Sequence, residues 1–449
     1  MKKRMAFLLS IATVLSLGMF TTGCAAVPAS VSAQNTESSS SDTSSASAGS
    51  SVSSSSAGTA SSSAGTSSGT SGTSSNTTGS ASGSSSAASS SSGSVTLIDT
   101  SSLFTDRDLA QTADTSDAVS YTVENGKDIT ITEAGVYIIS GTASDCTITV
   151  NCTDQDAKVQ IVLDGVSITN TDAPAIYVIS ADKCFVTTAE GSTNSLSVTG
   201  TFQADGTTNL DAVIFSKADL TMNGTGTLTI NSTGNGITSK DDLKVTGGAY
   251  DITAVKNGLE GKDSISVSGG TFTINATADG LHSENSDDNT LGAIYISGGT
   301  FNINSGDDGI HGTTAVVIDG GEFTINAVEG IEGTYIQIND GTISITASDD
   351  GINAAAKSTS LDVVIELNGG TITIVMGSGD TDAVDANGSI YVNGGNINIT
   401  GNSSFDYDTT GELNGGTVIV NGSQITEMPA QMQGGGMQGG MQGGKGMRG

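Results

Sequence analysis

Basic residues and proline are scarce in this sequence, and each shortage excludes a class of protein. The 449 residues include 15 Lys and Arg against 47 Asp and Glu, a formal net charge of −32. Nucleic acids and anionic bilayers are bound by clustered Lys and Arg, so neither is an expected partner. An anionic ligand would need bridging cations. Only 3 prolines accompany the 61 glycines, which excludes a collagen-like chain.

Cysteines and long apolar runs are also few. Beyond the first 24 residues three cysteines remain, Cys146, Cys152 and Cys184. An odd number permits at most one pair, so the fold does not depend on a disulfide framework. Cys146 and Cys152 can simply be small inward-facing apolar residues. After the apolar run from Met5 to Phe20, no second run approaches the ~20 residues that span a bilayer.

The two ends of the chain differ in composition from its middle. Residues 1–23 have the cationic start, apolar run and small residues that are typical of a secretory signal. The Gly-Cys pair that ends at Cys24 fits a bacterial lipobox. We expect a lipid on Cys24 to anchor the protein at the extracellular face of the cell membrane; the alternative is a plain signal peptide cut nearby. Residues 24–94, rich in Ser, Gly and Thr, are predicted to be a disordered linker, and residues 429–449 a Met/Gln/Gly-rich disordered tail.

Residues 95–428 repeat two short phrases with a period near 22. In the first phrase, apolar and polar residues alternate and are followed by two glycines. Its Gly-Gly slot falls at Gly247-Gly248, Gly269-Gly270, Gly298-Gly299, Gly320-Gly321, Asp340-Gly341, Gly369-Gly370, Gly394-Gly395 and Gly415-Gly416. The second phrase is an acid or amide followed by Gly and then Ile or Leu. Alternating strands and glycine turns at this period indicate a solenoid. Leucine-rich repeats would need a Leu/Asn pattern that is missing, and a β-propeller blade needs about twice this period. We therefore predict an all-β fold, a right-handed parallel β-helix.

The alternation also separates inward from outward side chains. It predicts an internal aromatic ladder of Tyr250, Phe272, Phe301 and Phe323. Residues 95–210 alternate less regularly and are predicted to form the first coils. Two steps of 29 residues predict long loops near 285–292 and 354–361.

Coils stacked ~4.8 Å apart align equivalent residues into rows. The first row is Asn235, Asn257, Asp279, Asp308, Glu329, Asp350 and Asp382; the second row, three residues on, is Thr238, Glu260, His282, His311, Glu332, Asn353 and Asp385. Asp307, Asp349 and Asp380 add acids just before the first row. Neighbouring carboxylates repel unless they are protonated or bridged, and calcium takes about six to eight oxygen ligands. We predict calcium as the cofactor. The alternative is a structural role without metal, because Asn and Asp before Gly are favoured where φ must be positive and Asn ladders stack well in β-helices.

Several runs occur in an order that is specific to one family. They include LFTDRDL, AGVYIISGT, KVQIVLDGVSITN, GITSKDDLKVTGGAYDITAV and SGDDGIHG. Over roughly residues 95–427 the chain resembles a bacterial family of secreted carbohydrate-binding β-helix proteins. That family comprises calcium-bound modules that hold cellulose and acidic plant polysaccharide, and it is structurally related to family-nine pectate lyases.

The resemblance implies three calcium-binding groups, because the related lyases use an Asp-Asp-Gly-apolar-Asp run with an acid from the preceding coil. The groups are Asp307, Asp308 and His311 with Asp279; Asp349, Asp350 and Asn353 with Glu329; and Asp380, Asp382 and Asp385 with Asp350. Glu332 of the second row is a further predicted ligand. Histidine is a poor calcium ligand, so the group with Asn353 is a better candidate than the group with His311.

The two rows of acids and amides, together with the family resemblance, predict a monomeric, non-catalytic protein at the cell surface that binds polysaccharide in a calcium-dependent manner. Tyr295 and Tyr391 share an outward slot and are the predicted sugar-stacking residues; tryptophan is absent, which argues against a tryptophan platform. The alternatives are a calcium-dependent pectate lyase-like enzyme and a structural adhesin for a protein partner. A lyase needs a base, for which Lys256 and Lys262 are candidates, but the repeats contain no arginine to clamp a uronate.

Overall fold

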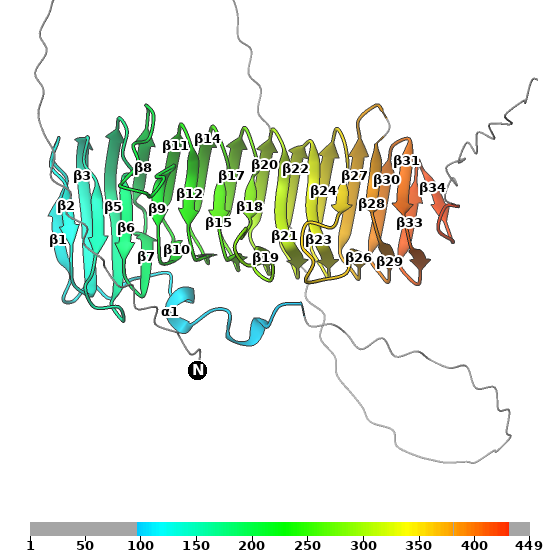
Figure 1. Ribbon diagram of the computed structural model, residues 1–449, viewed down its shortest axis with the longest axis horizontal. Coiled ribbons are helices and arrows are strands. Elements are labelled where there is room, and N and C mark those ends of the chain that lie inside the picture. Colours follow the sequence, from blue (N-terminus) through cyan, green and yellow to red (C-terminus); the bar gives the residue numbers. More distant parts are fainter. Residues whose placement is uncertain (1–96, 380, 431–449) are drawn as a thin grey trace, which may run out of the picture. The chain divides into compact units, whose positions relative to one another are not determined.

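The computed structural model describes residues 97–379 and 381–430, which wind into a stack of coils with three parallel sheets (Figure 1). The predicted parallel β-helix is confirmed. The signal peptide, Cys24, the linker up to residue 96, Asp380 and residues 431–449 lie outside the described residues. None of the described helices is long and apolar enough to cross a membrane.

Each regular coil contributes one strand to each of three sheets, in the order B, C, A along the chain. Sheet A contains β8 (Thr193–Val198), β11 (Thr227–Ser232), β14 (Ala249–Ala254), β17 (Thr271–Ala276), β20 (Thr300–Ser305), β22 (Glu322–Ala327), β24 (Thr342–Ala347), β27 (Thr371–Met376), β30 (Asn396–Thr400) and β33 (Thr417–Val420). Sheet B contains β2 (Ile129–Ile131), β4 (Ile148–Asn151), β6 (Ile176–Ser180), β9 (Ala212–Ser216), β12 (Asn235–Ser239), β15 (Leu259–Gly261), β18 (Leu281–Ser283), β25 (Ile352–Ala354), β28 (Asp382–Ala386) and β31 (Ser403–Tyr407). Sheet C contains β1 (Val119–Thr122), β7 (Lys183–Thr188), β10 (Asp219–Gly224), β13 (Asp242–Val245), β16 (Ser264–Val267), β19 (Ala293–Ile296), β26 (Val364–Leu367), β29 (Ser389–Val392) and β32 (Thr410–Leu413).

Four long strands pass from one sheet into the next. They are β3 (Gly135–Ser144), β5 (Lys158–Asn170), β21 (Asp308–Ile318) and β23 (Glu329–Ile338). The first two join sheets C and A, and the last two join sheets B and C. The register within each sheet is parallel, so equivalent residues of successive coils lie side by side.

The core lies inside the coils, where inward side chains of the three sheets meet. The predicted aromatic ladder is confirmed: ring centroids are 5.3 Å apart for Tyr250 and Phe272, 4.6 Å for Phe272 and Phe301, and 4.7 Å for Phe301 and Phe323. Residues before 210 form the first coils as predicted. All three described cysteines are free and buried in this core, which confirms that Cys146 and Cys152 are small inward-facing residues.

The N-terminal strap (residues 97–111) lies on the outer face of sheet C and carries η1 (Thr100–Ser102) and α1 (Asp106–Leu109) (Figure 1). Thr105 and Asp108 form a capping box that starts α1. The Arg107 guanidinium lies 4.4 Å from the centre of the Phe185 ring, and Lys244 Nζ donates to the carbonyl of Leu103. The strap therefore joins strands from several coils.

Asp108 fixes the strap through a buried ion pair. Its carboxylate, with no exposed surface, accepts from Lys183 Nζ at 2.7 Å and from Thr221 Oγ1 at 2.7 Å. Burial raises the pKa of Asp108, but hydrogen bonds from Lys183, Thr221 and Thr105 outweigh it and lower the pKa to about 2.

The two predicted long loops are confirmed and touch one another. The first connects β18 to β19 (residues 284–292) and the second connects β25 to β26 (residues 355–363). Ser358 Oγ donates to the carbonyl of Asn289 at 2.6 Å, and Asn289 Nδ2 donates to Thr359 Oγ1 at 2.6 Å. The loops thus meet across the two coils of β21 and β23.

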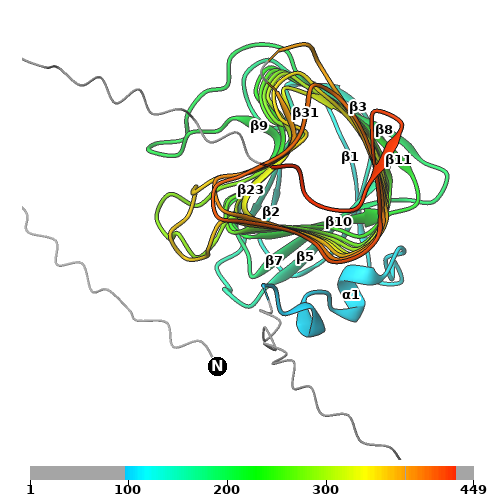
Figure 2. The same cartoon turned by 90° about the vertical axis from the view of Figure 1, so that its right-hand side faces the viewer.

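The C-terminal end of the stack is closed by its own chain. β34 (Ser423–Ile425) pairs antiparallel with β33, and Ile425 and Met428 pack against the core. Figure 2, which views the stack from this end, shows the final segment crossing the opening.

Candidate functional site

The two predicted rows lie next to each other along sheet B. The register places Glu260 opposite His282, His282 opposite His311, His311 opposite Glu332, Glu332 opposite Asn353, and Asn353 opposite Asp385. The structure therefore brings together second-row residues that are far apart in sequence. It also extends that row by Asp406, opposite Asp385.

First-row side chains join one coil to the next. Asp279 N donates to Asn257 Oδ1 at 3.1 Å, Asp308 N to Asp279 Oδ1 at 3.0 Å, and Asp382 N to Asp350 Oδ1 at 3.1 Å. One oxygen of each of these acceptors is thus held by the backbone of the following coil. The second oxygen of Asp279 contacts His282 of the neighbouring row.

A need for positive φ does not account for the acids and amides of the first row. Among the described residues, only Asp145 and Asn421 have positive φ without being glycine. The glycines after the first-row residues also lack positive φ and are needed for close packing instead. A Cβ on Gly309 would lie 2.6 Å from the carbonyl oxygen of Gly330 and 2.4 Å from a methyl group of Ile325. The alternative based on positive φ is therefore wrong for these positions.

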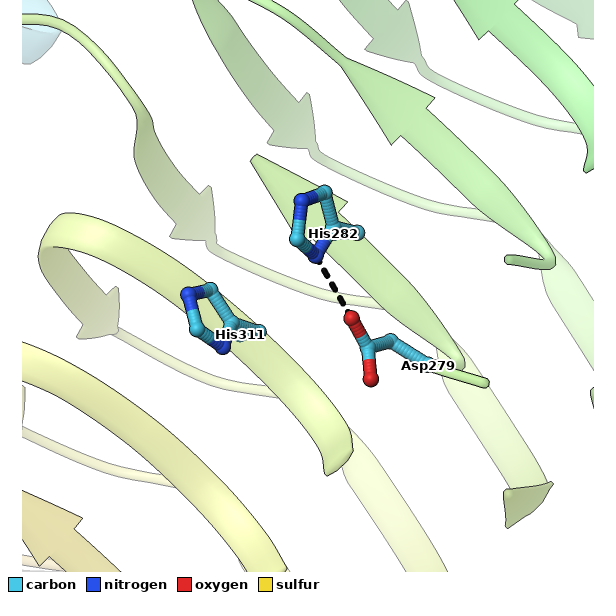
Figure 3. A group of neighbouring side chains, drawn as sticks. All are labelled: Asp279, His282 and His311. Carbon is cyan, nitrogen blue, oxygen red and sulfur yellow. Dashed lines mark hydrogen bonds and ion pairs between the residues drawn. The ribbon is translucent and has the colours of Figure 1, made fainter. Parts of the chain in front are cut away.

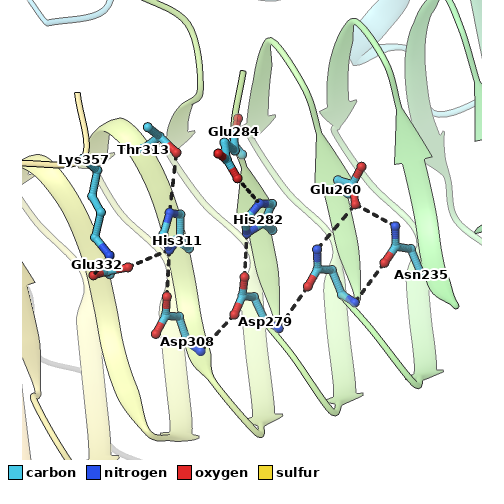
Figure 4. A network of polar contacts seen from close by, with 12 residues as sticks. Asn235, Glu260, Asp279, His282, Glu284, Asp308, His311, Thr313, Glu332 and Lys357 are labelled. Carbon is cyan, nitrogen blue, oxygen red and sulfur yellow. Dashed lines mark hydrogen bonds and ion pairs between the residues drawn. The ribbon is translucent and has the colours of Figure 1, made fainter. Parts of the chain in front are cut away.

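In the N-terminal part of the rows, acids are paired with basic side chains (Figure 4). Glu260 accepts from Lys240 Nζ at 2.6 Å, His282 Nδ1 lies 2.5 Å from Asp279 Oδ2, and Glu332 pairs with Lys357 at 2.5 Å. His311 Nδ1 lies 2.7 Å from an oxygen of Asp308 and 2.7 Å from an oxygen of Glu332.

These contacts keep His311 protonated at neutral pH. Burial lowers the pKa of His311, but the hydrogen bonds to Asp308 and Glu332 outweigh burial and raise it to about 10. Burial raises the pKa of Glu332, yet His311 and Lys357 lower it to about 2. This part of the rows is therefore neutralised largely by the protein's own cations.

The C-terminal part of the rows has only acids and amides. In the described part of the chain, no Lys, Arg or His lies within ion-pair distance of Asp350, Asp382, Asp385 or Asp406. Burial, followed by the charges of Asp350, Asp406, Asp382 and Asp408, raises the pKa of Asp385 to about 7. Burial and the nearby carboxylates likewise raise the pKa of Glu329 to about 7.

Asn353 leaves a buried oxygen without a partner in this acidic part. Its side chain is 9% exposed, and its Nδ2 donates to Glu329 Oε2 at 2.9 Å. Among the described residues, its Oδ1 has no hydrogen-bond partner, and neither does the buried hydroxyl of Thr381. An unpaired buried oxygen is costly, and a cation is one partner that would satisfy it.

Other predicted ligands occupy different surroundings. Asp279, Asp307 and Asp308 bring carboxylate oxygens within 4.8 Å of one another, although the first and third already contact histidines. Asp307 and Asp349 are exposed. Asp380 lies outside the described residues.

The two predicted sugar-stacking tyrosines do not share the expected exposure. Tyr295 is only 7% exposed, and its hydroxyl donates to Asp319 Oδ2 at 2.8 Å. The expectation of an exposed ring is wrong for Tyr295. Tyr391 is half-buried and lies in register with Glu366 and Glu412.

Two polar features were missed by the sequence analysis. Asp406 follows Ser403 at the three-residue spacing of the rows, and this spacing could have identified it, although its coil lacks the glycine. The second feature is a group of three carboxylates whose oxygens lie within 4.8 Å of one another, from Asp219, Asp241 and Asp242. The sequence pattern that could have identified this group is the recurrence of acids shortly after a lysine in successive coils, at Lys217, Lys240 and Lys262.

A cavity lies beside the acidic part of the rows. Its volume is about 460 Å³, and its lining includes Thr381, Asp382, Ser403, Asp406 and Pro429. It combines the unpartnered hydroxyl of Thr381 with two carboxylates, so hydroxyl-rich or cation-bound ligands suit it.

In a chelating buffer we expect the stability of the fold to fall as pH rises from 5 to 8. Glu329 and Asp385 have folded pKa values of about 7, above those of exposed carboxyls. Such groups bind protons more tightly when folded, so their contribution is present below about pH 4 and is lost as pH rises through 7. Thermal unfolding followed by circular dichroism at several pH values measures this. A midpoint that stays constant or rises over this range would contradict the expectation.

Known proteins resemble the chain over much of the β-helix. A family model described as a carbohydrate-binding domain-containing protein matches residues 125–381 and, again, residues 328–433. A curated protein of the same description from Acetivibrio thermocellus is 37% identical over 131 residues, which are 28% of this chain and 46% of that protein. The match thus spans about half the length of that relative. The solved structure of a polysaccharide lyase-like protein from C. thermocellum, a gadolinium derivative, aligns with a TM-score of 0.39 and 26% identity, over 68% of this chain and 97% of the other.

Proposed function

We propose that this chain, which belongs to the family of carbohydrate-binding domain-containing proteins, binds an acidic polysaccharide on sheet B through calcium and does not cleave it. The observation that carries the proposal is Asn353 Oδ1, which is buried, has no hydrogen-bond partner among the described residues and lies on the strand next to that of Asp385. The calcium ligands would come from Glu329, Asp350, Asn353, Asp382 and Asp385.

The donor chemistry of this group fits calcium. All five side chains offer oxygen, from four carboxylates and one amide, and they come from three successive coils. Calcium accepts about six to eight such oxygens in a flexible arrangement. When bound, it would neutralise the repelling carboxylates and supply a positive charge for an acidic ligand.

The net charge of −32 explains why the ligand would need the metal. Like charges on two surfaces repel within a Debye length of ~8 Å at physiological salt, and a bound divalent ion reverses the sign locally. A polyuronate chain would approach along sheet B, where Asp382 and Asp406 border the cavity. Its carboxylates and hydroxyls would then complete the coordination of calcium.

The surroundings of the lysines support binding without cleavage. Both candidate bases contact acids, since Lys256 contacts Asp211 and Lys262 contacts Asp287, and Lys240 likewise contacts Glu260. Hydrogen bonding to Asp287 raises the pKa of Lys262, which opposes its action as a base in proton abstraction from a uronide.

We also propose that the protein is held at the cell surface by a lipid on Cys24. The Gly-Cys pair after the apolar run supports this. Metabolic labelling with a radioactive fatty acid tests it, and a label that persists in Cys24→Ala would exclude that attachment.

Pectate binding is expected to require calcium. Affinity electrophoresis in gels that contain polygalacturonate, run with calcium or with chelator, measures the retardation. We expect strong retardation with calcium and none with chelator, whereas any binding to insoluble cellulose should depend on calcium only through the stability of the fold. Retardation that persists in chelator would contradict the bridging mechanism. Release of unsaturated uronide, followed by ultraviolet absorbance, would instead support the lyase alternative.

A further inference from the structure

The chain contains 2 histidines, and the fold places both on one row of sheet B. His282 on β18 and His311 on β21 are register partners in adjacent coils. Their rings stack with centroids 4.9 Å apart, and their side chains are 19% and 13% exposed. The calcium group proposed above uses neither ring.

Carboxylates surround these rings closely. Asp279 Oδ2 lies 2.5 Å from His282 Nδ1 (Figure 3), and His311 Nδ1 lies 2.7 Å from both Asp308 and Glu332. Asp279, His282 and His311 bring one donor atom each within 4.8 Å of one another, and so do Asp308, His311 and Glu332. Because the two triads share His311, nitrogen and oxygen donors converge at one place.

This mixture of donors differs from that of the calcium group. Imidazole nitrogen with carboxylate oxygen suits zinc and related late first-row metal ions, whereas calcium prefers oxygen alone. We propose that Asp279, His282 and His311 bind one divalent transition-metal ion of the zinc class. A water molecule would supply the fourth donor, which completes the number that zinc favours.

Binding exchanges protons for metal. A ligating imidazole nitrogen carries no proton, so the ion would displace any proton from the nitrogen that it binds, and that proton would pass to solvent. The ion would link the coils of β18 and β21. The sheet B rows would then hold two classes of metal, with nitrogen-containing ligands at β18 and β21 and all-oxygen ligands from β23 to β28.

Zinc titration of the purified, untagged protein in millimolar calcium tests the proposal. Isothermal titration calorimetry should give one zinc ion per chain, and His282→Gln or His311→Gln should each weaken binding by at least about 10-fold. Asp382→Asn with Asp385→Asn is the matched control, because it removes two acids of the same row system while leaving both histidines. It should keep the zinc affinity. Zinc affinity that is unchanged in both histidine variants would overturn the proposal.

A second measurement needs no variant. Cobalt in place of zinc should give visible absorption bands, which zinc should abolish and millimolar calcium should leave unchanged. Cobalt spectra that show no such bands would overturn the proposal even if a variant failed to fold. The outcome is independent of polysaccharide binding.

Discussion

Millimolar calcium is expected to raise the thermal unfolding midpoint of the purified protein, and Asp382→Asn with Asp385→Asn is expected to abolish this gain. A ligand present at about 100 times its dissociation constant adds about 2.7 kcal/mol per site to the free energy of unfolding. The two acids lie in the part of sheet B where the described chain supplies no basic partner and where the pKa of Asp385 is raised to about 7. Differential scanning calorimetry in chelator and in calcium measures the difference.

The same double variant should change stability in the opposite direction when calcium is chelated. Removing two crowded carboxylates relieves their repulsion, so the variant should unfold at a higher temperature than the wild type at pH 7 in chelator. Asp251→Asn with Glu322→Gln removes the same charge from exposed positions of sheet A, and this control should keep the full calcium gain. If calcium leaves the wild-type midpoint unchanged, the calcium group is wrong.

Asp108→Ala is expected to lower the free energy of unfolding by about 3–5 kcal/mol. The change leaves the Lys183 ammonium, 9% exposed, without its partner, and breaking a buried ion pair costs about this much. It also removes the acceptor of the Thr221 hydroxyl. Urea denaturation followed by circular dichroism measures the loss.

Replacing both partners of the ion pair distinguishes the cost of an unpaired Lys183 from the cost of detaching the strap. Asp108→Leu with Lys183→Met should recover most of the stability, because apolar residues of similar size often replace a buried pair at little cost. In Asp108→Ala, limited trypsin digestion should also cleave faster after Arg107, since the strap would detach from sheet C. Unchanged cleavage and a loss below about 1 kcal/mol would show that the strap is held by its other contacts.

The sequence predicted the parts of the fold that repeat. Phe272, Phe301 and Phe323 occupy equivalent positions of one phrase, so the parallel register alone stacks their rings. The same register aligns His282 with His311, and the long loops follow directly from the 29-residue steps. When the repeat period is constant, the residues that will be neighbours in adjacent coils can be predicted from the sequence.

Contacts between non-repeating segments could not be predicted in this way. The strap residue Asp108 meets Lys183 and Thr221, 75 and 113 positions later, and no periodicity connects them. Tyr295 occupies an outward slot, but only packing decides that this slot is covered. The glycines that follow the first row lack positive φ and are required because successive backbones and an inward Ile approach each other closely, which the pattern alone does not reveal.

The contact between the two long loops alters how the stack is expected to open. Coils of a solenoid usually touch only their nearest neighbours, so unfolding can begin at many points and spread coil by coil. Ser358 and Asn289, 69 positions apart, join the coils of β18 and β25 across those of β21 and β23. Either intervening coil can open only after the loops separate, so these four coils form one cooperative unit, within which slow amide hydrogen exchange is expected.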